Sequence, residues 1–72
     1  VKHHTNWRIK GIQRMDHRRS NELFLTAPMS ISNQDFAKIR EQLLQMIKMA
    51  VQTAKDSEAE DLFCLNIDFF RV

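Results

Sequence analysis

The sequence predicts an α+β fold, namely a two-layer α-β-α-β unit with a parallel two-strand core that is crossed over by one long helix. Apolar residues recur at three- and four-residue steps over residues 33–55, which is the period of a helix. Residues 22–31 and 62–70 instead alternate with period two, as half-buried strands do. Strand, helix and strand in this order indicate a right-handed crossover between parallel strands. Because two strands alone make no stable sheet, we expect a second copy or segments of a parent chain to complete it.

The first element is a helix expected over residues 4–18. Trp7, Ile12 and Met15 are spaced to share one face of it, and the basic residues lie largely elsewhere. Gly11 lowers the helix propensity by about 1 kcal/mol relative to alanine. An RRSN turn follows before the first strand.

The first strand is expected over residues 22–31. Its apolar side chains point one way, with Phe24 as the exception, and they are Leu23, Leu25, Ala27, Met29 and Ile31. Pro28 cannot donate to a strand ladder, so the strand is expected at a sheet edge or with a bulge at that residue.

The long helix is expected over residues 33–55, with Ser32 as its N-cap and the charge of Asp35 near the positive end of the helix dipole. At 1.5 Å per residue it spans about 35 Å, which is enough to carry the chain back along a strand. Its apolar stripe is wide, and we expect it to pack on a sheet and on a second helix.

The second strand is expected over residues 62–70, with one fully apolar face formed by its odd positions and a mixed face that carries Asp68. A carboxylate between Ile67 and Phe69 needs a basic partner across an interface or exposure to solvent. The residues expected at an interface between subunits or domains are Phe63, Leu65, Asp68, Phe70, Leu44 and Met49.

Length and composition indicate one small domain over residues 1–72 with a marginal core. The single Cys64 excludes an intramolecular disulfide, which leaves association or a missing remainder to stabilise the domain. Since the chain begins at Val1, we expect a C-terminal fragment of a longer protein. The sequence has no apolar stretch of about 20 residues and no signal peptide, so we expect a cytoplasmic protein with no membrane contact.

The charge is divided unevenly, with residues 1–19 at +5 and the remainder at −3. Such a division marks a basic helix packed on an acidic body, or an arm that faces a nucleic acid or a membrane. For a nucleic acid, Trp7 would be a stacking platform. The cations available for that alternative are Lys2, Arg8, Lys10, Arg14, Arg18 and Arg19. The sequence contains no helix-turn-helix or zinc-finger signature, so nucleic acid is the less favoured partner of this segment.

The sequence predicts no catalytic, cofactor-binding or metal-binding residues. His3, His4 and His17 lack the spacing of a metal site. Cys64 lies within an apolar run, where cysteine usually acts as an inert small hydrophobe. Neither a Gly-rich loop nor a pair of acids placed for hydrolysis is present, so we expect no enzyme activity and no cofactor.

Four stretches carry a resemblance to a known family, and they are WRIKGIQ, NELFLTAPMSIS, NQDFAKIREQL and LFCLNIDFF. In this order they resemble the C-terminal part of a bacterial conserved domain of unknown function whose longer members are described as transcriptional regulators. The resemblance implies no catalytic residues, and the regulatory role belongs to longer proteins with an additional N-terminal region. We therefore expect a non-catalytic interaction or oligomerisation module of a bacterial transcriptional regulator, with a nucleic-acid-binding accessory domain as the alternative.

Overall fold

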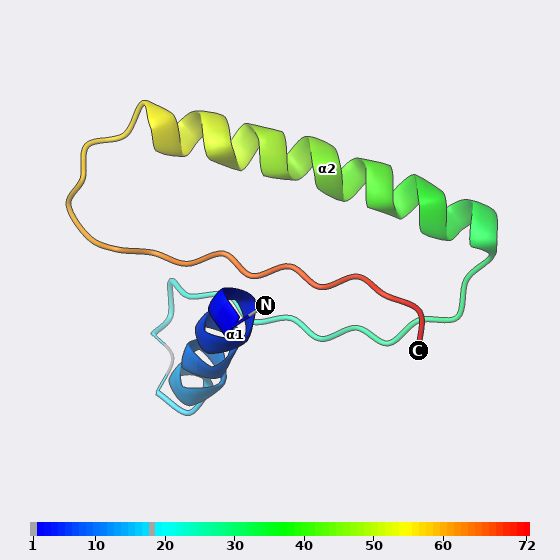
Figure 1. Cartoon of the computed structure of the whole chain (residues 1–72), viewed down its shortest axis with the longest axis horizontal. Coiled ribbons are helices and arrows are strands. Elements are labelled where there is room, and N and C mark those ends of the chain that lie inside the picture. The colour runs from blue at the N-terminus through cyan, green and yellow to red at the C-terminus, as the bar shows by residue number, and fades with distance from the viewer. Residues whose placement is uncertain (1, 18) are drawn as a thin grey trace. The chain divides into compact units, whose positions relative to one another are not determined.

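The computed structural model describes residues 2–17 and 19–72 of the chain. Helix α1 spans Lys2–Met15 and helix α2 spans Asn33–Lys55, and the other described residues form turns and irregular backbone (Figure 1). The chain divides into two compact units. Unit 1 contains the described residues up to Pro28 together with Phe63–Asp68, and unit 2 contains Met29–Leu62 together with Phe69–Val72.

Helix α1 begins near the N-terminus and ends at Met15, where a helix over residues 4–18 was expected. A turn follows directly, in which the backbone N–H of His17 donates to the carbonyl of Arg14 at 3.0 Å. Arg14 also places a positive charge in the last turn, beside the partial negative charge of the helix C-terminus. The expected last residue, Arg18, lies outside the described residues.

Helix α2 covers the range expected from the sequence, and its ends follow from local chemistry. Ser32 has extended backbone angles of φ −71° and ψ 159°, and its hydroxyl accepts a hydrogen bond from the backbone N–H of Asp35 at 3.0 Å. The carboxylate of Asp35 and the ammonium of Lys55 lie in the first and last turns, where each complements the helix dipole. The helix ends at Lys55, and the N–H of the C-cap residue Asp56 donates to the carbonyl of Ala54.

The predicted α+β fold is wrong, because the described residues contain two helices and no strand. Residues 22–31 and 62–70 form no ladder there, so the parallel pair and the crossover are absent from the described chain. Alternation of apolar side chains sets which way they point from the backbone, whereas a strand also needs a neighbour for its N–H and C=O groups. A pair of isolated strands is too weak to supply that neighbour.

Neither unit has a core, since no described residue is buried. On α2 the half-buried positions form one stripe, which consists of Phe36, Ile39, Leu43 and Ile47. Leu44 and Met49 on either side of this stripe are 39% and 71% exposed. On α1, Trp7 is half-buried, while Ile12 and Met15 of the expected apolar face are exposed. The apolar faces that the sequence marks are therefore largely open to solvent.

We expect the substitution Ser32→Ala to shorten α2 at its start, because the N–H of Asp35 loses its acceptor. Loss of such an N-cap costs about 1 kcal/mol of helix stability. Far-UV circular dichroism during thermal unfolding would measure the loss of helix signal. Ser30→Ala is the matched control, since Ser30 precedes the cap; an equal loss in both variants would contradict a capping role for Ser32.

Candidate functional site

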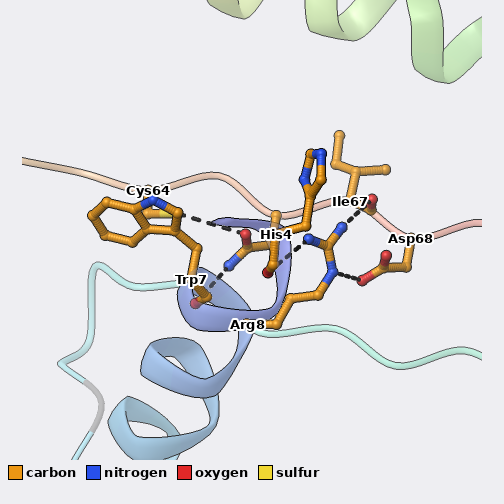
Figure 2. Close-up of polar contacts among 7 residues, drawn as sticks. His4, Trp7, Arg8, Cys64, Ile67 and Asp68 are labelled. Atoms are coloured by element: carbon orange, nitrogen blue, oxygen red, sulfur yellow. Dashed lines mark hydrogen bonds and ion pairs between the residues drawn. The ribbon is translucent and has the colours of Figure 1, made fainter. Parts of the chain in front are cut away.

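Arg8 of α1 joins the helix to the C-terminal segment of unit 1 (Figure 2). Its Nε donates to Oδ2 of Asp68 at 2.6 Å, and its Nη2 donates to the carbonyl of Ile67 at 3.0 Å. Nη1 donates back to the carbonyl of His4 at 3.1 Å, which lies one turn earlier in the same helix. The planar guanidinium therefore fixes two successive residues of the segment against one turn of α1.

Asn66 provides a second polar link between α1 and the same segment. Its Nδ2 donates to the carbonyl of Trp7 at 3.3 Å, and its Oδ1 accepts from the thiol of Cys64 at 3.6 Å (Figure 2). Trp7 and Arg8 are neighbours in α1, and Asn66, Ile67 and Asp68 are consecutive. The contact thus has a defined register, which two independent sets of hydrogen bonds maintain.

The charges at this contact stabilise one another. The hydrogen bond from Arg8 is the main cause that lowers the pKa of Asp68 below its ordinary value. The same hydrogen bond is the main cause that raises the pKa of Arg8. The side chains keep 30% and 50% of their surface exposed, so water screens the pair and its contribution to stability is small. Its role is to set geometry.

A second ion pair in unit 1 closes the turn between α1 and the segment that follows. Nη2 of Arg14 lies 3.1 Å from both carboxylate oxygens of Glu22, and the backbone N–H of Arg19 donates to Oε1 of Glu22 at 2.7 Å. The bond from the Arg19 N–H, followed by that from Arg14, lowers the pKa of Glu22. Sequence reasoning had not assigned Glu22 a role, although a single acid after a basic stretch was a signal for such a contact.

These pairs change the account of the basic N-terminal residues. Arg8 and Arg14 are already bound to carboxylates of their own chain, whereas Lys2, Lys10 and Arg19 are exposed. Trp7 is half-buried and packs edge-on against the His3 ring, with centroids 6.4 Å apart. Arg18 lies outside the described residues. The cationic surface of α1 is therefore smaller than its sequence indicates.

In unit 2 the C-terminal residues contact the first turn of α2. The rings of Phe36 and Phe69 stack with centroids 4.5 Å apart and planes 15° apart. The guanidinium of Arg71 lies 5.5 Å from the centroid of Phe36, and its Nη1 donates to Oδ1 of Asn33 at 2.8 Å. The apolar odd positions of residues 62–70 marked Phe69 as a packing residue, but nothing in the spacing indicated Arg71.

An open pocket of about 280 Å³ lies in unit 1, lined by His3, His4, Trp7, Phe63, Cys64, Leu65 and Asn66. Sites that bury a small molecule are usually enclosed and at least this large, whereas Phe63 here is 84% exposed. No three His, Cys, Asp or Glu side chains of the described residues converge as a metal site would require. Cys64 is a free and exposed thiol, not a covered hydrophobe.

The residues predicted at an interface lie on the surface of both units. Phe63 and Leu65 of unit 1 are exposed, and so are Phe70, Leu44 and Met49 of unit 2. Asp68 pairs with Arg8 of the same chain, and half of its side-chain surface stays exposed to solvent. The structure thus brings Asp68 into an internal contact and leaves the apolar members uncovered.

Comparison with known proteins places this small helical chain in a family. The sequence matches the family described as Domain of unknown function (DUF4423) over residues 1–72. The chain therefore belongs to that family. Neither a curated protein nor a solved structure matches it. Within the described residues, neither helix is long and apolar enough to cross a membrane.

We expect the Arg8 contact to weaken in acid. Contact with Arg8 lowers the pKa of Asp68 in the folded chain. The contact therefore stabilises the folded chain fully above the ordinary aspartate pKa of about 3.9. This stabilisation is lost as the pH falls through the lower pKa of the folded chain. The fluorescence of Trp7, the single tryptophan, would report the change in a titration from neutral pH to below about 4.

Asp68→Asn removes the titrating carboxylate and should reduce the amplitude of this transition. Asp61→Asn is the matched control, because Asp61 is an exposed acid of unit 2. An unchanged transition in the Asp68→Asn variant would contradict the assignment.

Proposed function

We propose that the chain is a non-catalytic interaction module through which a bacterial, cytoplasmic transcriptional regulator associates. One observation carries the proposal: 43% of the residues are hydrophobic, yet none of the described residues is buried. Burial of apolar surface is the dominant favourable term in both folding and association. Apolar side chains that are not buried within the chain gain this favourable free energy when they are buried against another protein surface.

The distribution of the exposed side chains supports the same function. Isolated exposed hydrophobic residues are common on proteins, but contiguous ones mark sites of contact. Leu62, Phe63 and Leu65 are close neighbours in sequence and are all well exposed, and so are Met46 and Met49 on α2. These residues supply apolar surface without catalytic geometry, as an interaction module requires.

The assignment to a transcriptional regulator rests on the sequence. The stretches WRIKGIQ and LNIDFF resemble longer proteins that are described as transcriptional regulators. In such a protein this module would join copies or domains, and DNA recognition would belong to another part of the chain. The family description itself states no activity.

The alternative, a nucleic-acid-binding accessory domain, has weaker support. It depends on cations of residues 2–19, and two of these, Arg8 and Arg14, are held by Asp68 and Glu22. Releasing them to phosphates would break the contacts that define unit 1. Lys2, Lys10 and Arg19 alone give a sparse surface for a polyanion.

We expect the 72-residue chain to associate as its concentration rises. Light scattering over a wide dilution series would measure its mass, and circular dichroism at each step would measure its helix content. Mass and helix content should fall together on dilution, because association covers the apolar side chains. If the chain is an unfolded monomer, the surface that buries its apolar side chains belongs to another part of the regulator. A fully helical monomer at every concentration would contradict the proposed function.

We expect no saturable binding of a short labelled DNA duplex by fluorescence anisotropy, even at low salt, because Arg8 and Arg14 are paired internally. The alternative function predicts binding whose logarithm falls with the logarithm of salt, with a slope of about −0.9 per phosphate contacted. If such binding occurs, and if Arg14→Ala with Arg19→Ala reduces the slope while Lys38→Ala on α2 does not, the alternative is favoured.

A further inference from the structure

We propose that α2 pairs with α2 of a second copy in antiparallel orientation, through the face that carries Ala37, Leu44 and Val51. This inference rests on the proposed function and names its partner. The three residues are each seven positions apart, so successive members lie only about 20° apart around the helix. All three are exposed, with Leu44 at 39% and Val51 at 53%.

This face is distinct from the rest of the apolar surface of α2. Met49 lies about 140° around the helix from Leu44, and polar positions that include Lys48 and Gln52 lie between them. Helices pack along one another through two apolar positions in every seven residues. With Ala37, Leu44 and Val51 at one of these positions, the other is occupied by Arg40, Ile47 and Ala54, of which two are apolar. The row therefore fits a helix as its partner better than it fits a loop or a small ligand.

A row of charges with the same spacing borders this face. Glu41, Lys48 and Lys55 are seven residues apart, and Glu41 and Lys48 lie about 60° and 40° around the helix from Leu44. Both are exposed, and neither forms an ion pair with another described residue. Glu41 accepts only a long hydrogen bond of 3.4 Å, from Nε2 of Gln45. These charges remain available to a partner.

The order of the charges favours a second copy in antiparallel orientation. When two copies of α2 cross near residues 44 and 45 in antiparallel orientation, Glu41 of each lies opposite Lys48 of the other. In parallel orientation this flank would face the opposite flank of the partner, which carries Arg40 and Ile47, so Lys48 would find no opposite charge there. Antiparallel orientation pairs both charges, and it also aligns the helix dipoles favourably. The same chain thus supplies both halves of a complementary surface.

The size of the face limits the strength of the pair. Helix α2 has 23 residues, which gives three repeats of seven, and that is near the shortest length over which such a pattern supports pairing. Ala37 adds little apolar area beside Leu44 and Val51. We therefore expect a reversible dimer whose population depends on concentration and on salt.

Charge exchange tests the arrangement in the 72-residue chain. Glu41→Lys and Lys48→Glu, made singly, place like charges opposite each other twice per dimer, and each should weaken dimerisation roughly tenfold. The double variant restores both pairs and should dimerise like the wild type. Lys38→Glu is the control, because Lys38 lies about 120° from Leu44. Sedimentation equilibrium would measure the dissociation constants, and circular dichroism would verify helix content.

Cross-linking tests the direction independently, in a Cys64→Ser background. Ala37→Cys and Val51→Cys chains should form a disulfide when mixed, because residue 37 lies opposite residue 51 only in the antiparallel pair. Ala37→Cys alone should not cross-link efficiently. Efficient self-linking of Ala37→Cys would overturn the antiparallel arrangement.

The outcomes separate this inference from the function on which it rests. Loss of dimer in the single charge variants and recovery in the double variant would support it. Association that is indifferent to these charges and to Leu44→Ala, or an unfolded monomer, would overturn the α2 pair and leave an interaction module with a different surface or partner. A folded monomer at every concentration would overturn both.

Discussion

Arg8 is the residue on which the geometry of unit 1 depends. Its guanidinium donates hydrogen bonds to His4, Ile67 and Asp68. It therefore links one turn of α1 to Ile67 and Asp68, which lie 59 and 60 positions after Arg8 in the sequence. The contact adds little to the stability of the chain, because water reaches both charged side chains. Its main effect is to fix which residues of the C-terminal segment lie against α1. An arginine serves this purpose better than a lysine, since its rigid fork can bind a carboxylate and a carbonyl at once.

Polar contacts of this kind leave the energetics of the chain incomplete. Helix α1 has 14 residues, near the lower limit for a stable isolated helix in water, and α2 relies on its caps and on a half-buried stripe. Neither helix gains the stabilisation of a buried core. Polar contacts within the chain fix parts of its backbone, while its apolar side chains stay exposed. We expect this combination in a module that completes its packing in an assembly.

The sequence predicted local features better than pairings. The residues Ser32 and Asp35 marked the start of α2, because a cap acts over three residues. The strands over 22–31 and 62–70 were wrong, since alternation of side chains says nothing about which backbone completes a ladder. For Asp68 the sequence left open a basic partner across an interface and exposure to solvent; it did not indicate Arg8, which lies 60 residues away, because no spacing rule reaches that far. The single domain and the association remain predictions.

The discontinuity of unit 1 has a consequence for how the chain folds. Its helix is made of the first residues of the chain, while the segment that Arg8 binds is Phe63–Asp68. Closing so long a loop costs entropy that short-range contacts do not, whereas α2 forms from neighbouring residues alone. During synthesis α1 leaves the ribosome before Phe63–Asp68, so the contact through Arg8 forms only after the residues of α2 have been made. Until then α1 lacks the segment that unit 1 pairs with it.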